Sequence, residues 1–199
     1  MPDEQTQGAK ATADTVEATS AGASEPQTED QPEAEEEKQP ESWFITGANG
    51  NLGQRLIRRL LSQGAVITAV VRSSRAEREL TRVFSATSQL RIEVIDYAET
   101  MLLAQAAYGA QYAVHLVGIL KSGKNATYAT AHESSCTSLT RALKDTSVEH
   151  ITYVSILGAK LYSNNACLAS KWRAERILYL CPIPSCTLRV PMVIGERDY

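Results

Sequence analysis

The sequence lacks the features that mark membrane, secreted and metal-binding proteins. No stretch approaches the ~20 consecutive apolar residues that a membrane-spanning helix requires. The amino-terminal part has neither the apolar region of a secretory signal nor the arginine-rich, acid-poor composition of a mitochondrial presequence. The four cysteines form no CxxC pair and the three histidines are scattered, so we expect reduced thiols and no metal site. These absences predict a cytoplasmic protein without a membrane span.

Residues 1–41 contain no isoleucine, leucine or aromatic residue and a single valine. They hold twelve of the 23 acidic residues but two of the 20 basic ones, which leaves residues 42–199 at +7 behind a segment at −10. Such a segment cannot bury enough apolar surface to offset the entropy lost on ordering. We predict a disordered acidic tail at 1–41 and one folded domain at 42–199. The tail is either a solubilising extension or an acidic arm that binds the basic domain or a basic partner protein.

Apolar runs alternate with helical segments along residues 42–199. The runs at 65–71 and 112–117 show no inside/outside alternation, as expected for strands buried on both faces of a parallel sheet. Strict alternation predicts an α/β fold with a doubly wound parallel sheet, the Rossmann fold. The other predicted strands are 43–45, 90–95, 151–154 and 187–190, and the predicted helices begin at Leu52 and cover 75–84, 101–107, 131–144 and 170–180.

A glycine-rich segment, TGANGNLG at residues 46–53, follows the first predicted strand and opens into a helix. In a phosphate-binding turn, Gly47 would take a positive φ, Gly50 would leave room for a pyrophosphate, and Gly53 would let the helix pack closely. An ordinary strand-to-helix turn can contain the same three glycines, so the context decides. The predicted phosphate site consists of Gly47, Ala48, Asn49, Gly50, Asn51, Leu52 and Gly53.

In a doubly wound sheet the ligand lies beyond the carboxyl ends of the strands. Arg72 follows the second strand, where an NAD-specific site would have an acidic residue. An arginine there suits a 2′-phosphate and favours NADP(H) over NAD(H), although a solvated arginine at a helix start is the alternative. After the third strand, Asp96 and Tyr97 could contact an adenine, or Asp96 could cap the next helix. Val117 and Gly118 would let the cofactor approach the fourth strand.

Together these segments resemble the short-chain dehydrogenase/reductase superfamily. The sequence is most similar to the atypical branch that includes NmrA-like proteins and the nucleotide-binding accessory subunit of respiratory complex I. The resemblance covers residues 43–199. It rests on TGANGNLG at 46–53, Asp96-Tyr97, LVG at 116–118, YVSILGA at 153–159, SKWRAE at 170–175 and LRVPMVIG at 188–195.

The resemblance implies a catalytic Ser, Tyr and Lys, in which Ser orients a carbonyl, Tyr transfers the proton, and Lys lowers the Tyr pKa and holds the nicotinamide ribose. Ser155 and Lys171 match two of them, but Cys167 stands where the tyrosine belongs, four residues before Lys171. Cys167 is either a buried hydrophobic residue or a proton donor that is too short. Tyr162 could replace the missing tyrosine only if the backbone placed its side chain in the site.

The resemblance also implies a carboxyl-terminal part that closes the substrate pocket, and the sequence stops where that part would begin. We expect this part to be missing, so that the domain is either truncated or a binding domain without a substrate lid. We therefore predict an NAD(P)-binding domain with weak or no redox activity and a sensor or assembly role. An active NADPH-dependent reductase or epimerase/dehydratase-like enzyme is the alternative, and a non-binding interaction domain a further one. Basic residues such as Arg55, Arg58 and Arg59 are spread over helices, so no nucleic-acid site is expected.

Overall fold

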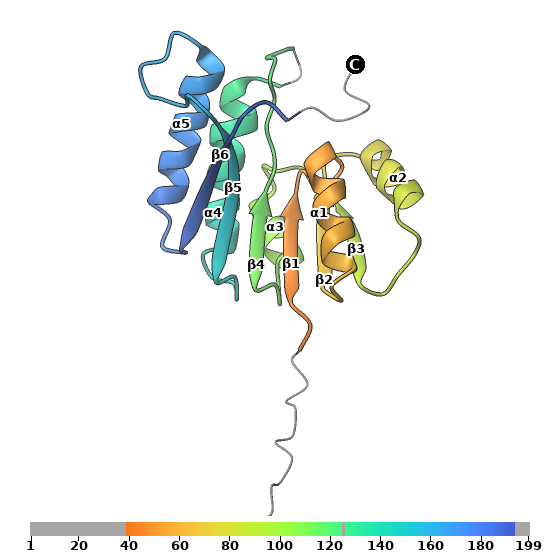
Figure 1. The fold of residues 1–199 in the computed structure, drawn as a ribbon. Helices are drawn as coiled ribbons and strands as arrows, with labels where there is room; N and C mark the ends of the chain where they lie inside the picture. Colours follow the sequence, from red (N-terminus) through yellow and green to blue (C-terminus); the bar gives the residue numbers. More distant parts are fainter. Residues whose placement is uncertain (1–38, 125, 194–199) are drawn as a thin grey trace, which may run out of the picture. The chain divides into compact units, whose positions relative to one another are not determined.

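The computed structural model describes residues 39–124 and 126–193. The predicted acidic tail, apart from residues 39–41, and the chain after residue 193 lie outside these residues. Six strands and six helical segments alternate along the described chain (Figure 1). The strands are β1 (Ser42–Thr46), β2 (Val66–Val71), β3 (Leu90–Val94), β4 (Tyr112–His115), β5 (His150–Ile156) and β6 (Ser185–Val190). The helices are α1 (Asn51–Leu61), α2 (Ser74–Val83), α3 (Thr100–Ala106), η1 (Ala129–Ser134), α4 (Ser135–Leu143) and α5 (Ala166–Tyr179).

The six strands form one parallel sheet in the order β3-β2-β1-β4-β5-β6. Ile45 in β1 is paired with Ala69 of β2 on one side and with Val114 of β4 on the other. The predicted α/β fold with a doubly wound parallel sheet is therefore confirmed. The strand order reverses direction between β1 and β4, and this is the position at which such sheets bind ligands, beyond the carboxyl ends of the strands.

Two helical segments differ from the sequence-based boundaries by more than one residue. Helix α5 begins at Ala166 rather than at residue 170, because the side chain of Asn165 accepts hydrogen bonds from the backbone N–H groups of Cys167 and Leu168. The segment predicted as one helix at 131–144 is instead a π-helical turn, η1, followed directly by α4. Sequence periodicity does not distinguish a π-helical turn from a regular one, and such turns occur frequently at functional sites.

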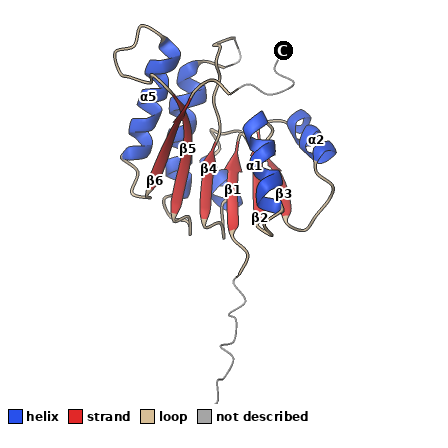
Figure 2. Ribbon diagram, in the orientation of Figure 1, coloured by secondary structure: helices blue, strands red, loops and turns tan. Residues whose placement is uncertain are grey.

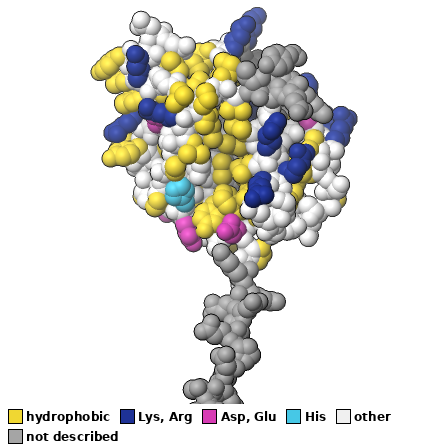
Figure 3. Space-filling model, in the orientation of Figure 1, with side chains coloured by type: hydrophobic (Ala, Val, Ile, Leu, Met, Phe, Trp, Pro, Cys, Tyr) yellow, Lys and Arg dark blue, Asp and Glu magenta, His cyan; other side chains and the backbone are white. Residues whose placement is uncertain are grey.

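The sheet has helices on both sides but is not covered evenly. Helices α1 and α2 pack on one face of β1, β2 and β3, and α3, α4 and α5 pack on the opposite face (Figure 2). No helix of the described residues covers the first face over β5 and β6 (Figure 2). Hydrophobic side chains gather on that face (Figure 3), where Leu188 is 47% exposed and Val154 is half-buried. Among the described residues, this face of the sheet is thus left without a helix over β5 and β6.

Two glycines allow the turn after β1 to pack tightly. Gly47 has a φ of +74°, and a Cβ there would lie 2.9 Å from the Leu116 carbonyl carbon and 3.0 Å from the Val117 nitrogen. A Cβ on Gly53, in the first turn of α1, would lie 2.7 Å from the Ala48 carbonyl carbon. Both distances are below those that real side chains tolerate, so the turn must remain free of side chains at these positions.

We expect Gly53→Ala to lower the free energy of unfolding by about 1–3 kcal/mol, because the added methyl overlaps backbone that cannot move independently. Gly123→Ala is the matched control, since a Cβ at Gly123 would meet no atom within 4 Å. Its effect should stay within about 0.5 kcal/mol. Urea denaturation of the three proteins measures both values. Equal stabilities of Gly53→Ala and the parent would show that α1 does not depend on this close packing.

Candidate functional site

The turn between β1 and α1 exposes the amino-terminal end of a helix. Gly50 is the N-cap of α1, no side chain caps the helix, and the first turn contains no acidic residue. The positive end of the helix dipole is therefore not compensated locally, and an anion would be stabilised there. A Cβ on Gly50 would lie 3.3 Å from the Gly47 carbonyl oxygen, a tight but tolerable contact.

A cavity of about 650 Å³ lies over this turn, between the ends of β1 and β4. A second pocket of about 180 Å³ extends from it toward β5 and α5. Both are lined by Leu52, Leu116, Gly118, Leu120, Met192 and Val193. The cavity over the turn, at about 650 Å³, has a volume typical of cofactor sites. Of the predicted cofactor residues, those that line these cavities are Gly47, Gly50, Asn51, Leu52, Gly53, Gly118 and Lys171.

Three other predicted residues, two in the turn and one beyond β4, serve the structure around the cavity. Ala48 and Val117 are buried, so their side chains pack in the core. Asn49 is half-buried, and its carbonyl oxygen accepts a hydrogen bond from the Gln54 side chain. Their predicted contacts with a cofactor would involve backbone atoms, and they stay predictions.

Tyr97 packs behind the glycine turn. The backbone N–H of Gly47 donates to the Tyr97 hydroxyl (2.9 Å), which in turn donates to the Val70 carbonyl (3.4 Å). Burial raises the pKa of Tyr97 to about 12. Asp96 is exposed, and its carboxylate accepts from the Ala98 N–H. The alternative that Asp96 caps the next helix is wrong, because the N-cap of α3 is Glu99. Adenine contact by Asp96 or Tyr97 stays a prediction.

Two arginines follow β2, and the structure distinguishes them. Arg72 is exposed, lies over the Tyr97 ring at 5.8 Å from its centroid, and forms no ion pair within the described part of the chain. Arg75 pairs with Glu79 one helical turn later, at 3.0 Å. Ser73 caps α2 between them. Of the two arginines, Arg72 is therefore the one whose guanidinium is not bound to a carboxylate within the described residues.

Lys171 enters the smaller pocket from α5. Its ammonium donates to the Val154 carbonyl at 3.0 Å and lies 4.6 Å from the centroid of the Tyr153 ring. A Cβ on Gly118 would lie 2.9 Å from the Lys171 nitrogen, so this glycine makes room for the lysine. Burial lowers the pKa of Lys171. Sequence analysis placed Gly118 against the cofactor but gave no sign that it also contacts Lys171.

The remaining predicted catalytic residues are engaged elsewhere. The Ser155 hydroxyl donates to Glu175 (2.5 Å), and Arg189 binds the same carboxylate. The Cys167 thiol is buried and donates to the Ile119 carbonyl (3.6 Å), and burial raises its pKa. Tyr162 is 90% exposed and lines neither cavity. The structure thus brings Ser155, Cys167 and Lys171 to one pocket, and each of them donates a hydrogen bond to a protein atom.

Sequence analysis missed Glu175, which lies one turn after Lys171 within the segment SKWRAE, and His132 in η1. The His132 Nε2 accepts from the Ile119 N–H at 3.1 Å. His115, in β4, lies between Thr46 (2.6 Å) and Ser135 (3.1 Å). Both histidines are buried. Burial, assisted by the Lys171 charge, lowers the pKa of His115 to about 3 and that of His132 to about 4.

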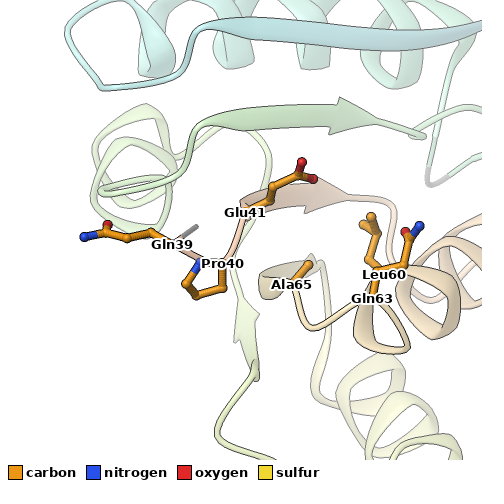
Figure 4. Close-up of a pocket in the computed structure, with 6 residues that line it drawn as sticks. All are labelled: Gln39, Pro40, Glu41, Leu60, Gln63 and Ala65. Carbon is orange, nitrogen blue, oxygen red and sulfur yellow. The ribbon is translucent and has the colours of Figure 1, made fainter. Parts of the chain in front are cut away.

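Another cavity lies at the opposite, amino-terminal end of β1 and β2. It measures about 250 Å³ and is lined by Gln39, Pro40, Glu41, Leu60, Gln63 and Ala65 (Figure 4). The side chains of Gln39 and Glu41 point in different directions (Figure 4), and none of the predicted site residues is present. We assign no ligand to it.

Residues 47–179 match a protein family described as NAD(P)H-binding. The chain belongs to this family. Over 85 residues it is 35% identical to the fatty acid hydroxylase uhd1 of Mycosarcoma maydis. The aligned region covers 42% of this chain and 28% of that protein. The predicted NAD(P)-binding family is confirmed, whereas the narrower NmrA-like branch stays a prediction.

Solved structures share the fold. WbmH of Bordetella bronchiseptica in complex with NAD⁺ superposes with a TM-score of 0.67 and 19% identity, covering 80% of this chain and 59% of WbmH. The NADPH-dependent quinone oxidoreductase QOR2 of Escherichia coli, complexed with NADPH, superposes with a TM-score of 0.59 and 23% identity. The superposition covers 74% of this chain and 48% of QOR2. These neighbours have the fold expected of the predicted superfamily. The chain spans between about half and three fifths of their length.

Among the described residues, no helix is both long and apolar enough to cross a membrane. Nor do these residues bring three or more His, Cys, Asp or Glu side chains together where a metal ion could bind.

We expect the free energy of unfolding to fall as the pH is lowered from 7 to 5. His115 and His132 stay neutral in the folded protein, with pKa values of about 3 and about 4, whereas in the unfolded chain a histidine pKa is about 6.5. As the pH falls, the histidines of the unfolded chain are therefore protonated before those of the folded protein. This lowers the free energy of unfolding by about 2 kcal/mol per histidine at pH 5. Urea denaturation at pH 7, 6 and 5 measures the slope.

His132→Gln is the companion variant, because the glutamine side-chain oxygen reaches the position of Nε2 and can still accept from the Ile119 N–H while it cannot titrate. The slope should fall to about half in this variant. A parent protein whose stability is independent of pH between 7 and 5 would show that these histidines are not held neutral.

Proposed function

We propose that this chain binds NADP(H) in preference to NAD(H) in the crevice between the ends of β1 and β4, and that it has little or no carbonyl-reducing activity. The observation that carries the proposal is the cavity over a side-chain-free turn at the uncapped end of α1. A pyrophosphate would lie there against backbone N–H groups and the helix dipole. When bound, the nicotinamide ring would supply hydride transfer.

The positions of the other residues fit a dinucleotide laid across the turn. Arg72 follows β2, on one side of β1, and Lys171 binds the end of β5, on the other. The adenosine half would lie toward Arg72 and the nicotinamide half toward Lys171. The pocket beside Lys171 is otherwise mostly apolar, with Ile119, Val154 and Ile156 among its walls, which suits a nicotinamide ring.

The preference for NADP(H) rests on Arg72. A guanidinium can bind a 2′-phosphate with two parallel charge-assisted hydrogen bonds, and Arg72 has no carboxylate partner in the described chain. No acidic side chain follows β2 to bind the ribose hydroxyls that an NAD-specific site would recognise.

We expect Arg72→Ala to weaken NADPH binding roughly ten- to a hundredfold while NADH binding changes less than about threefold, because the charge-assisted contact is made to the 2′-phosphate alone. Arg75→Ala is the matched control, since Arg75 is bound to Glu79, and it should change neither affinity more than about twofold. Isothermal titration calorimetry gives all six dissociation constants. Equal affinities of the parent for the two cofactors would refute the preference.

The proposal of weak chemistry rests on the proton donors. Ser155, Cys167 and Lys171 each donate to a protein atom, and Cys167 cannot reach as far as a tyrosine. The pocket is also lined by Val154 and Ile156, which lie on the face of β5 that no helix of the described residues covers (Figure 2). A domain that binds the cofactor without turning it over would serve as a redox sensor or an assembly factor.

An active NADPH-dependent reductase, or an epimerase/dehydratase-like enzyme, is the second candidate. The observation that favours it is Lys171, which lies in a pocket continuous with the cofactor cavity. Several of the solved neighbours carry such activities in their names, including the UDP-glucuronic acid 4-epimerase of Bacillus cereus in complex with NAD. At 17% identity over 74% of this chain, that likeness reports the fold.

We expect NADPH oxidation with a panel of aldehydes, ketones and quinones to proceed below about 0.1 s⁻¹, against about 10 s⁻¹ for a typical enzyme. Loss of a general acid alone costs about 10²–10⁴-fold, and water entering an open site adds to the loss. Cys167→Ala should leave the residual rate unchanged. Robust turnover that survives Cys167→Ala but is lost in Lys171→Ala would establish the reductase instead.

A further inference from the structure

Tyr97 touches both parts of the chain that would bind the phosphates of NADPH. Its hydroxyl contacts Gly47 in the turn after β1, and its ring lies against Arg72, which follows β2. Tyr97 itself follows β3 and is 8% exposed. Three strand ends thus meet at one side chain. This arrangement differs from the adenine contact that the sequence suggested for it.

The hydroxyl fixes the conformation of the glycine turn. The Gly47 N–H donates to the Tyr97 hydroxyl at 2.9 Å. Gly47 has a φ of +74°, and the nearby Leu116 backbone leaves no space for a side chain there. The hydroxyl proton is directed at the Val70 carbonyl, so a lone pair remains for Gly47. Without the hydroxyl, the Gly47 N–H would lose its acceptor inside the protein, which is costly for a backbone group. The raised pKa of Tyr97 keeps the phenol protonated through the physiological range.

The ring positions the arginine. The Arg72 guanidinium carbon lies 5.8 Å from the ring centroid, within the range of a cation–π contact. A guanidinium that rests on an aromatic face keeps its N–H edges available for a phosphate. Because Arg72 is exposed and has no ion pair in the described residues, the ring is the contact that limits where its side chain lies.

We propose that Tyr97 is a positioning residue with two separable effects: its hydroxyl sets the affinity for the cofactor through Gly47, and its ring sets the selectivity for the 2′-phosphate through Arg72. Both effects rest on the proposed function, because both concern the bound cofactor. The contact between the Tyr97 hydroxyl and Gly47, on which the first effect depends, is present without a cofactor.

Calorimetry with NADPH and NADH on Tyr97→Phe and Tyr97→Leu separates the two effects. Tyr97→Phe removes the hydroxyl and keeps the ring, so both affinities should fall by a similar factor, about five- to twentyfold, with their ratio unchanged. Tyr97→Leu removes the ring as well, so the ratio should also fall several-fold toward that of Arg72→Ala. Tyr108→Phe, at an 86% exposed position, is the control and should match the parent. Tyr97→Met replaces the leucine variant if the latter does not fold.

Unchanged affinities in Tyr97→Phe would overturn the hydroxyl half, and an unchanged ratio in Tyr97→Leu would overturn the ring half. Amide hydrogen exchange by NMR tests the hydroxyl contact with no cofactor present. The Gly47 amide should exchange at least tenfold faster in Tyr97→Phe than in the parent, with the Ile45 amide unaffected. Equal protection of Gly47 refutes the contact. A parent that binds neither cofactor refutes the proposed function and both effects on binding with it, while a faster Gly47 exchange in Tyr97→Phe would still establish that the hydroxyl holds the turn.

Discussion

The backbone after β1 approaches the end of β4 so closely that no side chain fits between them. Gly47 meets this constraint with a positive φ and a missing Cβ that would otherwise strike Leu116 and Val117. The same approach directs the chain into α1 and brings Gly118, just beyond β4, to the wall of the same cavity. The parallel sheet puts the carboxyl ends of its strands along one edge, and the crevice opens where the strand order reverses.

The two halves of the site differ: one is arranged to bind a phosphate, whereas the polar side chains of the other donate hydrogen bonds to the protein itself. The phosphate half has the uncapped α1, the side-chain-free turn and an arginine without a carboxylate partner in the described chain. In the other half, Lys171 donates to Val154 and the Ser155 proton is held by Glu175. The first arrangement favours binding of a phosphate-bearing ligand. In the second, the Ser155 proton is already bound to a carboxylate and the thiol of Cys167 stands in place of a tyrosine, which supports a binding role.

The sheet and the glycine turn could be predicted because their signals are local. Apolar runs mark strands, and TGANGNLG lies between a strand and a helix in one continuous segment. Contacts between distant segments could not be predicted. Tyr97 lies 50 residues from its partner Gly47, and Ser155 lies 20 residues from Glu175. Nothing in either segment specifies which rotamer its side chain takes, because that choice depends on packing across the sheet. The engagement of Ser155 was invisible to sequence analysis for this reason.

The central claim is that the dinucleotide lies on the turn between β1 and α1. Calorimetric titration of NADPH into the parent and into Gly50→Ala tests it most directly, since the added methyl would occupy the space of the pyrophosphate. Within the fold, this methyl would lie 3.3 Å from the Gly47 oxygen, a tight contact that a shift of a few tenths of an ångström relieves, so the variant should keep its circular dichroism spectrum. The account predicts saturable binding by the parent and none by Gly50→Ala. Equal binding by the two folded proteins would place the cofactor elsewhere and contradict the account.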